Sequence, residues 1–341
     1  MKNLPGIILC LMIALPAYLS GKAFPLIGGP IAAILAGILL SLFFPNFTGK
    51  EFGKGFSFSR GIKFTSKKLL QYAIIFIGFE MNLFNVLRVG RLSLTVMAFT
   101  FLAAFITAFL AGKLLKLPGN TTVLIGVGTS VCGGSAIAAV APVIRAEDED
   151  VARAISTIFL FNIIAVFIFP VLGRLMGMED AAFGVWAGTA INDTSSVLAA
   201  GALWSNASGN NTALSFAAIV KLTRTLMIVP ITLVLALYTA RKTKLSEAGS
   251  FSFVKVFPWF VLFFIAAAIF NTLLNIPPGV SAFLVQTGKF VITMAMAAIG
   301  LNTNLKSLFS NGVKPLLLGF ICWIVIAIVS LAVQQLIPTQ P

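Results

Sequence analysis

The sequence predicts an all-α polytopic membrane protein that forms a single transmembrane domain over residues 1–341. Of the 341 residues, 59% are hydrophobic and only 10% are charged, and the mean hydropathy is +1.03, whereas a soluble domain has about 25% charged residues. Apolar stretches of about 17 to 25 residues recur from end to end, which is the length a helix needs to cross roughly 30 Å of hydrocarbon. They are apolar on every face, unlike the alternating strands of a membrane barrel.

About eleven segments are expected to span the membrane, with ten as the smaller count. The first segment follows Lys2 and ends in small and polar residues, so it can also be interpreted as a signal peptide. No stretch is long and polar enough to form a separate soluble domain. The expected spans are 4–20, 27–44, 69–87, 93–115, 121–144, 151–173, 183–203, 213–239, 256–275, 284–305 and 315–337.

The basic residues lie in the short segments between the apolar runs and indicate the topology. If the eleven segments alternate in direction, sixteen Lys and Arg fall on the side of the N-terminus and five on the other side. The positive-inside rule then places the N-terminus in the cytoplasm and the C-terminus outside, in the inner membrane of a bacterium. The net charge of +14 does not indicate a nucleic-acid partner, because these residues form no basic face with interleaved aromatics. The lipid bilayer is the expected surrounding.

Several kinds of chemistry are excluded by composition. The chain has no histidine, so a His-dependent catalytic triad, an HExxH zinc site and haem ligation by His are all impossible. Its three cysteines, Cys10, Cys132 and Cys322, lie inside apolar runs and indicate neither a disulfide framework nor a CxxC metal site. We therefore expect no metal, no cofactor and no enzymatic activity.

Two short runs resemble each other at an offset of 222 residues. Residues 77–83 read Ile-Gly-Phe-Glu-Met-Asn-Leu and residues 299–305 read Ile-Gly-Leu-Asn-Thr-Asn-Leu. The copies, around 71–87 and 288–309, fall in spans three and ten, so they would run in opposite directions, as in inverted-topology transporter repeats. Coincidence between two glycine-containing apolar helices is the alternative, and the register of a duplication stays open. Three polar residues in these copies are candidates for ion coupling: Glu80, Asn82 and Asn304.

The span 121–144 is interrupted by a run of glycines and hydroxyls where a membrane helix should be most apolar. Residues 126–136 read Gly-Val-Gly-Thr-Ser-Val-Cys-Gly-Gly-Ser-Ala, which predicts a broken helix whose freed backbone groups line a site. The following half-helix would present its N-terminal amides, and its positive dipole end, to an anion. Close packing through small residues is the alternative. The candidate substrate-binding residues here are Ser130, Cys132, Gly133, Gly134 and Ser135.

The span 183–203 contains five consecutive polar residues, 192–196, in the middle of an apolar run. A carboxylate at Asp193 must be paired, protonated or metal-bound, because an isolated charge costs roughly 2.5 to 3.5 kcal/mol in the membrane centre. It is a candidate site for a coupling ion, H⁺ or Na⁺, and a salt bridge between helices is the alternative. The candidate ion-coupling residues here are Asn192, Asp193, Thr194 and Ser195.

The span 213–239 carries two cations, Lys221 and Arg224, three residues apart and therefore on one helix face. Arg offers a planar fork that matches oxyanions, and Lys adds a compact charge, so both are candidates for binding an anionic substrate. Pairing with Asp193 and Glu80, or snorkelling to an interface, are the alternatives. The three interrupted spans together define a broken-helix core of approximately residues 121–239.

The three motifs resemble segments of the YeiH-type family of proposed sulfate exporters in bacterial inner membranes. The similar runs are 128–144, 187–201 and 220–230, and their order and the number of spans extend the resemblance over nearly the whole chain. That family is similar to the cation/proton antiporters and bile-acid symporters, whose fold has two broken helices that cross near the midplane. The matching positions are Cys132, Gly133, Ser135, Asn192, Asp193, Lys221 and Arg224. Other members have His-Glu at 192–193, so the resemblance gives no His-based proton relay in this chain.

The residues and the resemblance together predict a secondary transporter that exports a small anion similar to sulfate or sulfite. Transport is expected to be ion-coupled, to work by alternating access, and to need no partner beyond the anion and the bilayer, with a homodimer left open. A Na⁺/H⁺ antiporter, with Asp193 as the ion site, is the alternative within transport. An intramembrane enzyme is disfavoured by the missing histidines and short loops, and a scaffold would leave the clustered polar residues unexplained.

Overall fold

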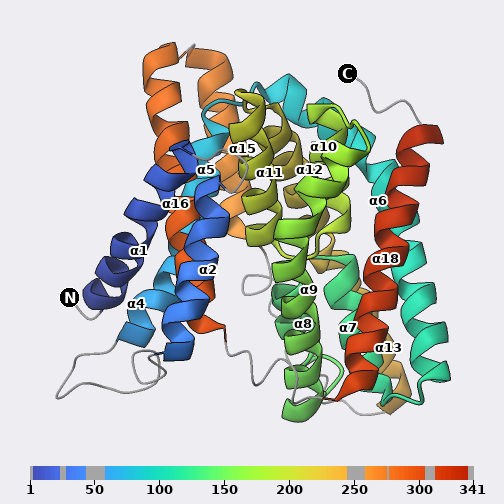
Figure 1. The fold of residues 1–341 in the computed structure, drawn as a ribbon. Coiled ribbons are helices and arrows are strands. Elements are labelled where there is room, and N and C mark those ends of the chain that lie inside the picture. Colours follow the sequence, from blue (N-terminus) through green and yellow to red (C-terminus); the bar gives the residue numbers. More distant parts are fainter. Residues whose placement is uncertain are drawn as a thin grey trace.

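The computed structural model describes residues 3–23, 28–43, 58–243, 258–274, 276–303 and 312–336, and within these ranges it is helical with no strand (Figure 1). The candidate residue Asn304 lies outside the described residues. The helices form two bundles that lie side by side in Figure 1. We call the face where α1 begins the N-side and the face where α18 ends the C-side.

The first bundle joins the N-terminal helices to two helices from the C-terminal third. Helix α2 packs against α1 and α16, and α5 packs against α15 and α16. Glycines bring two backbones together, since a Cβ on Gly300 would lie 2.3 Å from the carbonyl oxygen of Ile34. The members are α1 (Leu4–Ala23), α2 (Gly28–Phe43), α4 (Phe58–Phe64), the π-helix η1 (Thr65–Leu69), α5 (Leu70–Gly78), α15 (Trp259–Leu274) and α16 (Pro278–Asn302).

The second bundle contains all three interrupted segments. Its members are α6 (Leu83–Leu114), α7 (Gly119–Ser130), α8 (Gly134–Val140), α9 (Asp148–Leu175), α10 (Asp180–Ala190), α11 (Thr194–Ser208), α12 (Thr212–Leu226), α13 (Ile228–Thr243) and α18 (Val313–Leu336). Helix α12 packs between α10, α11 and α6, and α9 packs against α7 and α11. The contact with the first bundle is made mainly by α11, which touches α2 and α16.

The lengths of these helices confirm the predicted class. Six of the described helical stretches are long and apolar enough to cross a membrane, and two shorter apolar helices accompany them. Large apolar side chains in the middle parts of long helices, such as Leu102 of α6 and Ile328 of α18, are exposed, as expected where lipid replaces water as the solvent. The protein is therefore an all-α, multi-pass membrane protein.

Helices α10 and α11 form a hairpin, so the expected single crossing over residues 183–203 is wrong. The carboxylate of Asp180, where α10 begins, accepts hydrogen bonds from Trp204 Nε1 (2.6 Å) and Ser208 Oγ (2.9 Å), near the end of α11. The rings of Phe183 and Trp204 stack with their centroids 4.0 Å apart. The two helices are therefore antiparallel, and both of their outer ends lie on the C-side.

Helices α7 and α8 form a second hairpin that enters from the other face, so the span 121–144 also returns. The Thr121 hydroxyl at the start of α7 donates to the carboxylate of Asp150 at the start of α9, and the space beside Gly133 borders Ile158 and Asn162 of α9. Since α7 and α9 run in the same direction, the chain must turn back between them, and it does so through α8. Two broken helices thus meet tip to tip, whereas the resemblance implied two broken helices that cross.

The hairpins also revise the topology. Arg145 and Arg153 move to the N-side and Arg174 to the C-side, which changes the tally of Lys and Arg among the described residues from ten against five to eleven against four. The asymmetry that the positive-inside rule uses becomes sharper.

The two copies of the short repeat end helices that run in opposite directions. Ser281, at the start of α16, donates its hydroxyl to the carbonyl oxygen of Phe79 just after α5 (2.9 Å), so α5 and α16 are antiparallel. The copy at 77–83 therefore ends a helix on the C-side, and the copy at 299–305 begins in the last turns of a helix that ends on the N-side. This is the orientation expected of an inverted repeat.

Candidate functional site

The tips of the two hairpins meet at one side chain, Asn162, which lies midway along α9. Its Oδ1 accepts a hydrogen bond from the backbone amide of Asp193 (3.1 Å) in the second tip. Its Nδ2 lies 3.5 Å from the position that a Cβ on Gly133 would occupy in the first tip, and the Asp193 Cβ is equally close. The two breaks predicted from sequence are therefore adjacent in space, at mid-height of the bundle.

The first tip is a tight turn between α7 and α8. Gly133 has φ +69° and ψ −131°, a conformation that essentially only glycine adopts, which explains the glycine at this point of the break. Ser130 and Cys132 are buried, Gly134 is partly exposed and Ser135 is exposed. Nothing lies within 4 Å of the Cβ position of Gly134, so the start of α8 faces open space.

The second tip is an extended link that runs directly into α11. Asp193 is the N-cap of α11, and its carboxylate accepts hydrogen bonds from the backbone amide (2.9 Å) and the hydroxyl of Ser195. A carboxylate at this position satisfies a free amide and interacts favourably with the positive end of the helix. Asp193 and Thr194 are half-buried, so part of this tip is also accessible.

Lys221 joins the two tips from α12. Its Nζ donates to the backbone carbonyls of Val131 (2.9 Å), Ile191 (3.1 Å) and Asn192. A lysine ammonium has three N–H donors, so these three acceptors use all of them. The side chain is 0% exposed, and its charge lies where α7 and α10 both end.

Arg224 makes the equivalent contacts one turn further along α12. Its Nε donates to the carbonyl oxygen of Ser130 (2.6 Å), and its two terminal nitrogens donate to those of Thr129 and Thr189. Its Cζ lies 5.9 Å from the centroid of the Phe101 ring. The last carbonyls of a helix lack partners within the helix and carry partial negative charge, so both cations cap the converging ends of α7 and α10.

These contacts assign the two cations to the backbone instead of to a free anion. Direct binding of the substrate by Lys221 and Arg224 stays a prediction, whereas snorkelling is wrong because both side chains are fully buried. Among the described residues, neither Lys221 nor Arg224 has a carboxylate oxygen within 4.0 Å, so pairing with Asp193 or Glu80 is not formed. Lys221 and Arg224 stand out in the sequence because they are charged, but their partners are backbone atoms far along the chain and leave no signal in it.

Asn192 differs from its neighbours because its side chain is buried without a partner. It is 1% exposed, and neither Oδ1 nor Nδ2 has a hydrogen bond to any described residue. Leaving a buried polar group unpaired costs about 1–3 kcal/mol, and such groups are usually explained by a bound water, ion or ligand. Asn192 was predicted from the sequence as a site residue, whereas Asn162 was not. The signal that could have indicated Asn162 is a lone amide side chain midway along an apolar helix.

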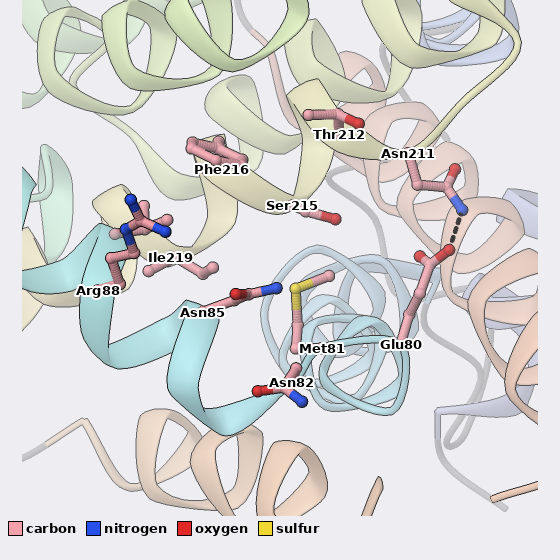
Figure 2. A pocket seen from close by; sticks show the side chains of 11 residues that line it. Glu80, Met81, Asn82, Asn85, Arg88, Asn211, Thr212, Ser215, Phe216 and Ile219 are labelled. Atoms are coloured by element: carbon pink, nitrogen blue, oxygen red, sulfur yellow. Dashed lines mark hydrogen bonds between the residues drawn. The ribbon is translucent and has the colours of Figure 1, made fainter. Parts of the chain in front are cut away.

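Glu80 and Asn82 lie elsewhere. The Glu80 carboxylate accepts from Asn211 Nδ2 (2.6 Å), and Asn82 caps α6 by accepting from the Phe84 amide (2.8 Å). They line a separate cavity at the start of α12 (Figure 2), nine residues or about 13 Å along that helix from Lys221. The structure thus divides the candidate ion-coupling residues between two places. Among the described residues, no three His, Cys, Asp or Glu side chains cluster in a way that could hold a metal ion.

Fold and site together define a multi-pass helical membrane protein in which two re-entrant hairpins meet at buried charge and amide groups. Residues 5–319 match the family model described as conserved hypothetical protein 698. The chain is 46% identical over 351 residues to a UPF0324 membrane protein of Fusobacterium nucleatum, covering 98% of this chain and 99% of that protein. It is 49% identical over 340 residues to a UPF0324 membrane protein of Streptococcus pyogenes, covering 98% and 97%.

A third relative is a UPF0324 membrane protein of Streptococcus mutans. The two chains are 47% identical over 342 residues, which cover 98% of each. The chain therefore belongs to the conserved hypothetical protein 698 family, whose similar members are named UPF0324 membrane proteins. This confirms the family of membrane proteins that the three motifs indicated. No solved structure matches the chain.

Proposed function

We propose that the protein is a secondary transporter that moves a small oxyanion, similar to sulfate or sulfite, through the site between the hairpin tips. The observation that carries the proposal is the meeting of the two tips at mid-height beside the unpartnered amide of Asn192. Broken helices at the centre of a membrane protein are a recurrent way to build a transport site, because their free amides and carbonyls bind the substrate and coupling ions.

The electrostatics of the tips favour an anion. Helices α8 and α11 both begin there, so their positive ends and unpaired amides face the same region. Lys221 and Arg224 bring two positive charges against the single carboxylate of Asp193. All three N–H donors of Lys221 and one donor on each nitrogen of Arg224 bind carbonyls, so these cations cancel the negative ends of α7 and α10 and leave the positive ends of α8 and α11 dominant.

Coupling is assigned to Asp193. Its carboxylate is half-buried and next to Asn192 and Ser195, so it can take up H⁺ or Na⁺ as the site changes its access from one face to the other. Binding a cation there would remove the negative charge that repels the oxyanion, which couples the two movements.

The orientation follows from the basic residues. With eleven of the described Lys and Arg on the N-side and four on the C-side, the positive-inside rule favours the N-side as the cytoplasmic face of a bacterial cell. The exposed start of α8 belongs to the hairpin that enters from the N-side, which is consistent with substrate entering from the cytoplasm for export.

The test is counterflow of labelled sulfate into proteoliposomes that contain the purified protein and are loaded with unlabelled sulfate. We expect saturable exchange that sulfite inhibits and that Ser135→Ala weakens several-fold, because the hydroxyl at the exposed start of α8 is lost. Thr287→Ala is the matched control, since the Thr287 hydroxyl is exposed and donates only to Phe283 of its own helix. Tight vesicles that show neither sulfate exchange nor sulfite inhibition would contradict the proposed substrate.

Cation/proton antiport is the second candidate, because Asp193 and the Oδ1 of Asn192 place two oxygens that can bind Na⁺ in one tip. An antiporter would dissipate a pH gradient on addition of Na⁺ with no transported anion present. An anion transporter would require sulfate or sulfite for any movement of H⁺ or Na⁺.

A further inference from the structure

A second polar cavity lies at the C-side ends of α6 and α12, away from the hairpin tips. It has a volume of about 310 Å³, enough for a small polar ligand and several waters. Figure 2 shows side chains of both helices, and of the turn before α6, around this space. Its polar lining includes Glu80, Asn85, Arg88, Asn211, Thr212 and Ser215.

Most of the hydrogen-bond donors in this lining are free. Among the described residues Arg88 has neither a hydrogen bond nor a carboxylate within 4.0 Å, and no side-chain hydrogen bond joins Asn85 or Ser215 to the rest of the described chain. A guanidinium, an amide and a hydroxyl are the groups that bind an oxyanion through several oxygens at once.

Arg88 has an exposed side chain and lies in the second turn of α6, near the positive end of the helix. An oxyanion bound there would interact favourably with both the guanidinium and the helix end. Arg88 also lies on the C-side, where four of the described Lys and Arg are found against eleven on the N-side. No described carboxylate lies within 4.0 Å of the Arg88 guanidinium, so an oxyanion would meet no competing ion pair there.

The helix ends add to this preference. Helix α6 begins at Leu83 and α12 begins at Thr212, and residues of both first turns line the cavity, so two positive helix ends converge on it. The carboxylate of Glu80 is engaged by Asn211 (2.6 Å), and in Figure 2 this pair lies at the opposite end of the group from Arg88. The half of the cavity around Arg88, Asn85 and Ser215 is therefore the positive half.

We propose that this cavity is a second oxyanion-binding site, in which Arg88 is the main ligand and Asn85 and Ser215 donate further hydrogen bonds. It binds a small oxyanion of the size of sulfate from the C-side. The evidence for oxyanion binding is the cavity. The further statement that this site is the C-side end of the transport path rests on the proposed function. The site is distinct from the hairpin tips, because the tips are lined from α9, α10 and the far end of α12.

The test uses Thr212→Cys, which places a thiol at the exposed start of α12 and leaves the proposed ligands intact. The full-length protein in detergent is treated with a sulfonate-bearing and an ammonium-bearing methanethiosulfonate, with and without sulfate. The three native cysteines are buried, and the protein without the added cysteine gives the background. We expect the anionic reagent to label this thiol faster than the cationic reagent does, and we expect sulfate to protect the thiol from labelling.

Adding Arg88→Gln should lower the ratio of the two rates by roughly three- to tenfold, as loss of a steering charge does, and should abolish protection by sulfate. Adding Arg91→Gln, an exposed arginine that does not line the cavity, is the matched control and should change the ratio much less. Absence of sulfate protection, or an Arg91→Gln effect as large as that of Arg88→Gln, would overturn the proposal. Because labelling requires no transport, a failure of sulfate counterflow leaves this result interpretable.

Discussion

Lys221 and Arg224 act at the residue scale as caps for two helices to which neither belongs. Between them they donate to six backbone carbonyls, three in the first tip and three in the second. A buried cation is expensive unless its donors are all satisfied, and here the satisfied partners are the groups that the hairpin breaks leave free. The two tips and the end of α12 therefore depend on one another.

Replacing the ammonium of Lys221 with an apolar group should destabilise the protein. Lys221→Met keeps a similar length but leaves three buried carbonyls without donors, which we expect to lower the free energy of unfolding by roughly 3 kcal/mol or more. The measurement is the thermal unfolding midpoint in detergent, with Lys113→Met at the exposed end of α6 as the control. An unchanged midpoint together with lost sulfate exchange would instead indicate direct contact with the anion.

Asp180 makes stability depend on pH at the C-side end of the second hairpin. Burial raises the pKa of the Asp180 carboxyl, but hydrogen bonds from Asn210, Trp204 and Ser208 outweigh it and hold the pKa below its ordinary value of 3.8. A carboxyl with a lowered pKa stabilises the folded state above its unfolded pKa and loses that contribution as the pH falls through the folded value.

The midpoint difference between the wild type and Asp180→Ala should therefore be largest at neutral pH and constant down to about pH 5, then narrow toward pH 3. Thermal unfolding across this range measures it. A difference that widens on acidification would contradict the assignment. Ser208→Ala, which removes one of the three donors, should show a smaller effect at neutral pH.

At the scale of elements, the first hairpin depends on one backbone conformation. Gly133 has φ +69°, whereas the next residue, Gly134, has an ordinary φ and open space at its Cβ position. Gly133→Ala should cost about 1–3 kcal/mol of stability through backbone strain, and Gly134→Ala should be neutral or slightly stabilising. Thermal unfolding of the two variants side by side decides this, and equal midpoints would argue against the turn.

The helices and the positions of both breaks could be predicted from the sequence, but the direction of the chain after each break could not. Apolar length predicts a helix, and the glycines near Gly133 and the polar run at Asp193 predict an interruption. Whether the chain then continues or returns depends on contacts such as Asp180 with Trp204, which no local pattern contains. The partners of Lys221 are also hidden from the sequence, because they are backbone carbonyls 29 to 90 residues away.

At the scale of the whole molecule, two hairpins that enter from opposite faces place a polar site at mid-height inside an otherwise apolar bundle. Each hairpin keeps its backbone groups within helices except at the tip, and the tips satisfy one another through Asn162, Lys221 and Arg224. Irregular backbone deep in a membrane protein is tolerated only where protein or a substrate site surrounds it. The hairpin tips meet this condition.

The opposed hairpins can be tested by labelling from one face. Cysteines introduced by Met176→Cys and Ala207→Cys, at the two outer ends of the second hairpin, should react with an impermeant maleimide from the same face. Those introduced by Lys113→Cys and Glu147→Cys, at the outer ends of the first hairpin, should react from the other face. If the two cysteines at the ends of one hairpin react from opposite faces, the segment between them crosses the membrane and the hairpin is contradicted.

The most direct test of a transport site at the tips is labelled-sulfate counterflow by Asn192→Leu, with its thermal unfolding measured in parallel. The backbone carbonyl that accepts from Lys221 remains, and replacing an unpartnered buried amide with an apolar group should leave stability unchanged or raise it. We predict that exchange is lost, at least about tenfold, while the midpoint does not fall. Undiminished exchange by a stable Asn192→Leu protein would contradict a substrate site at the hairpin tips.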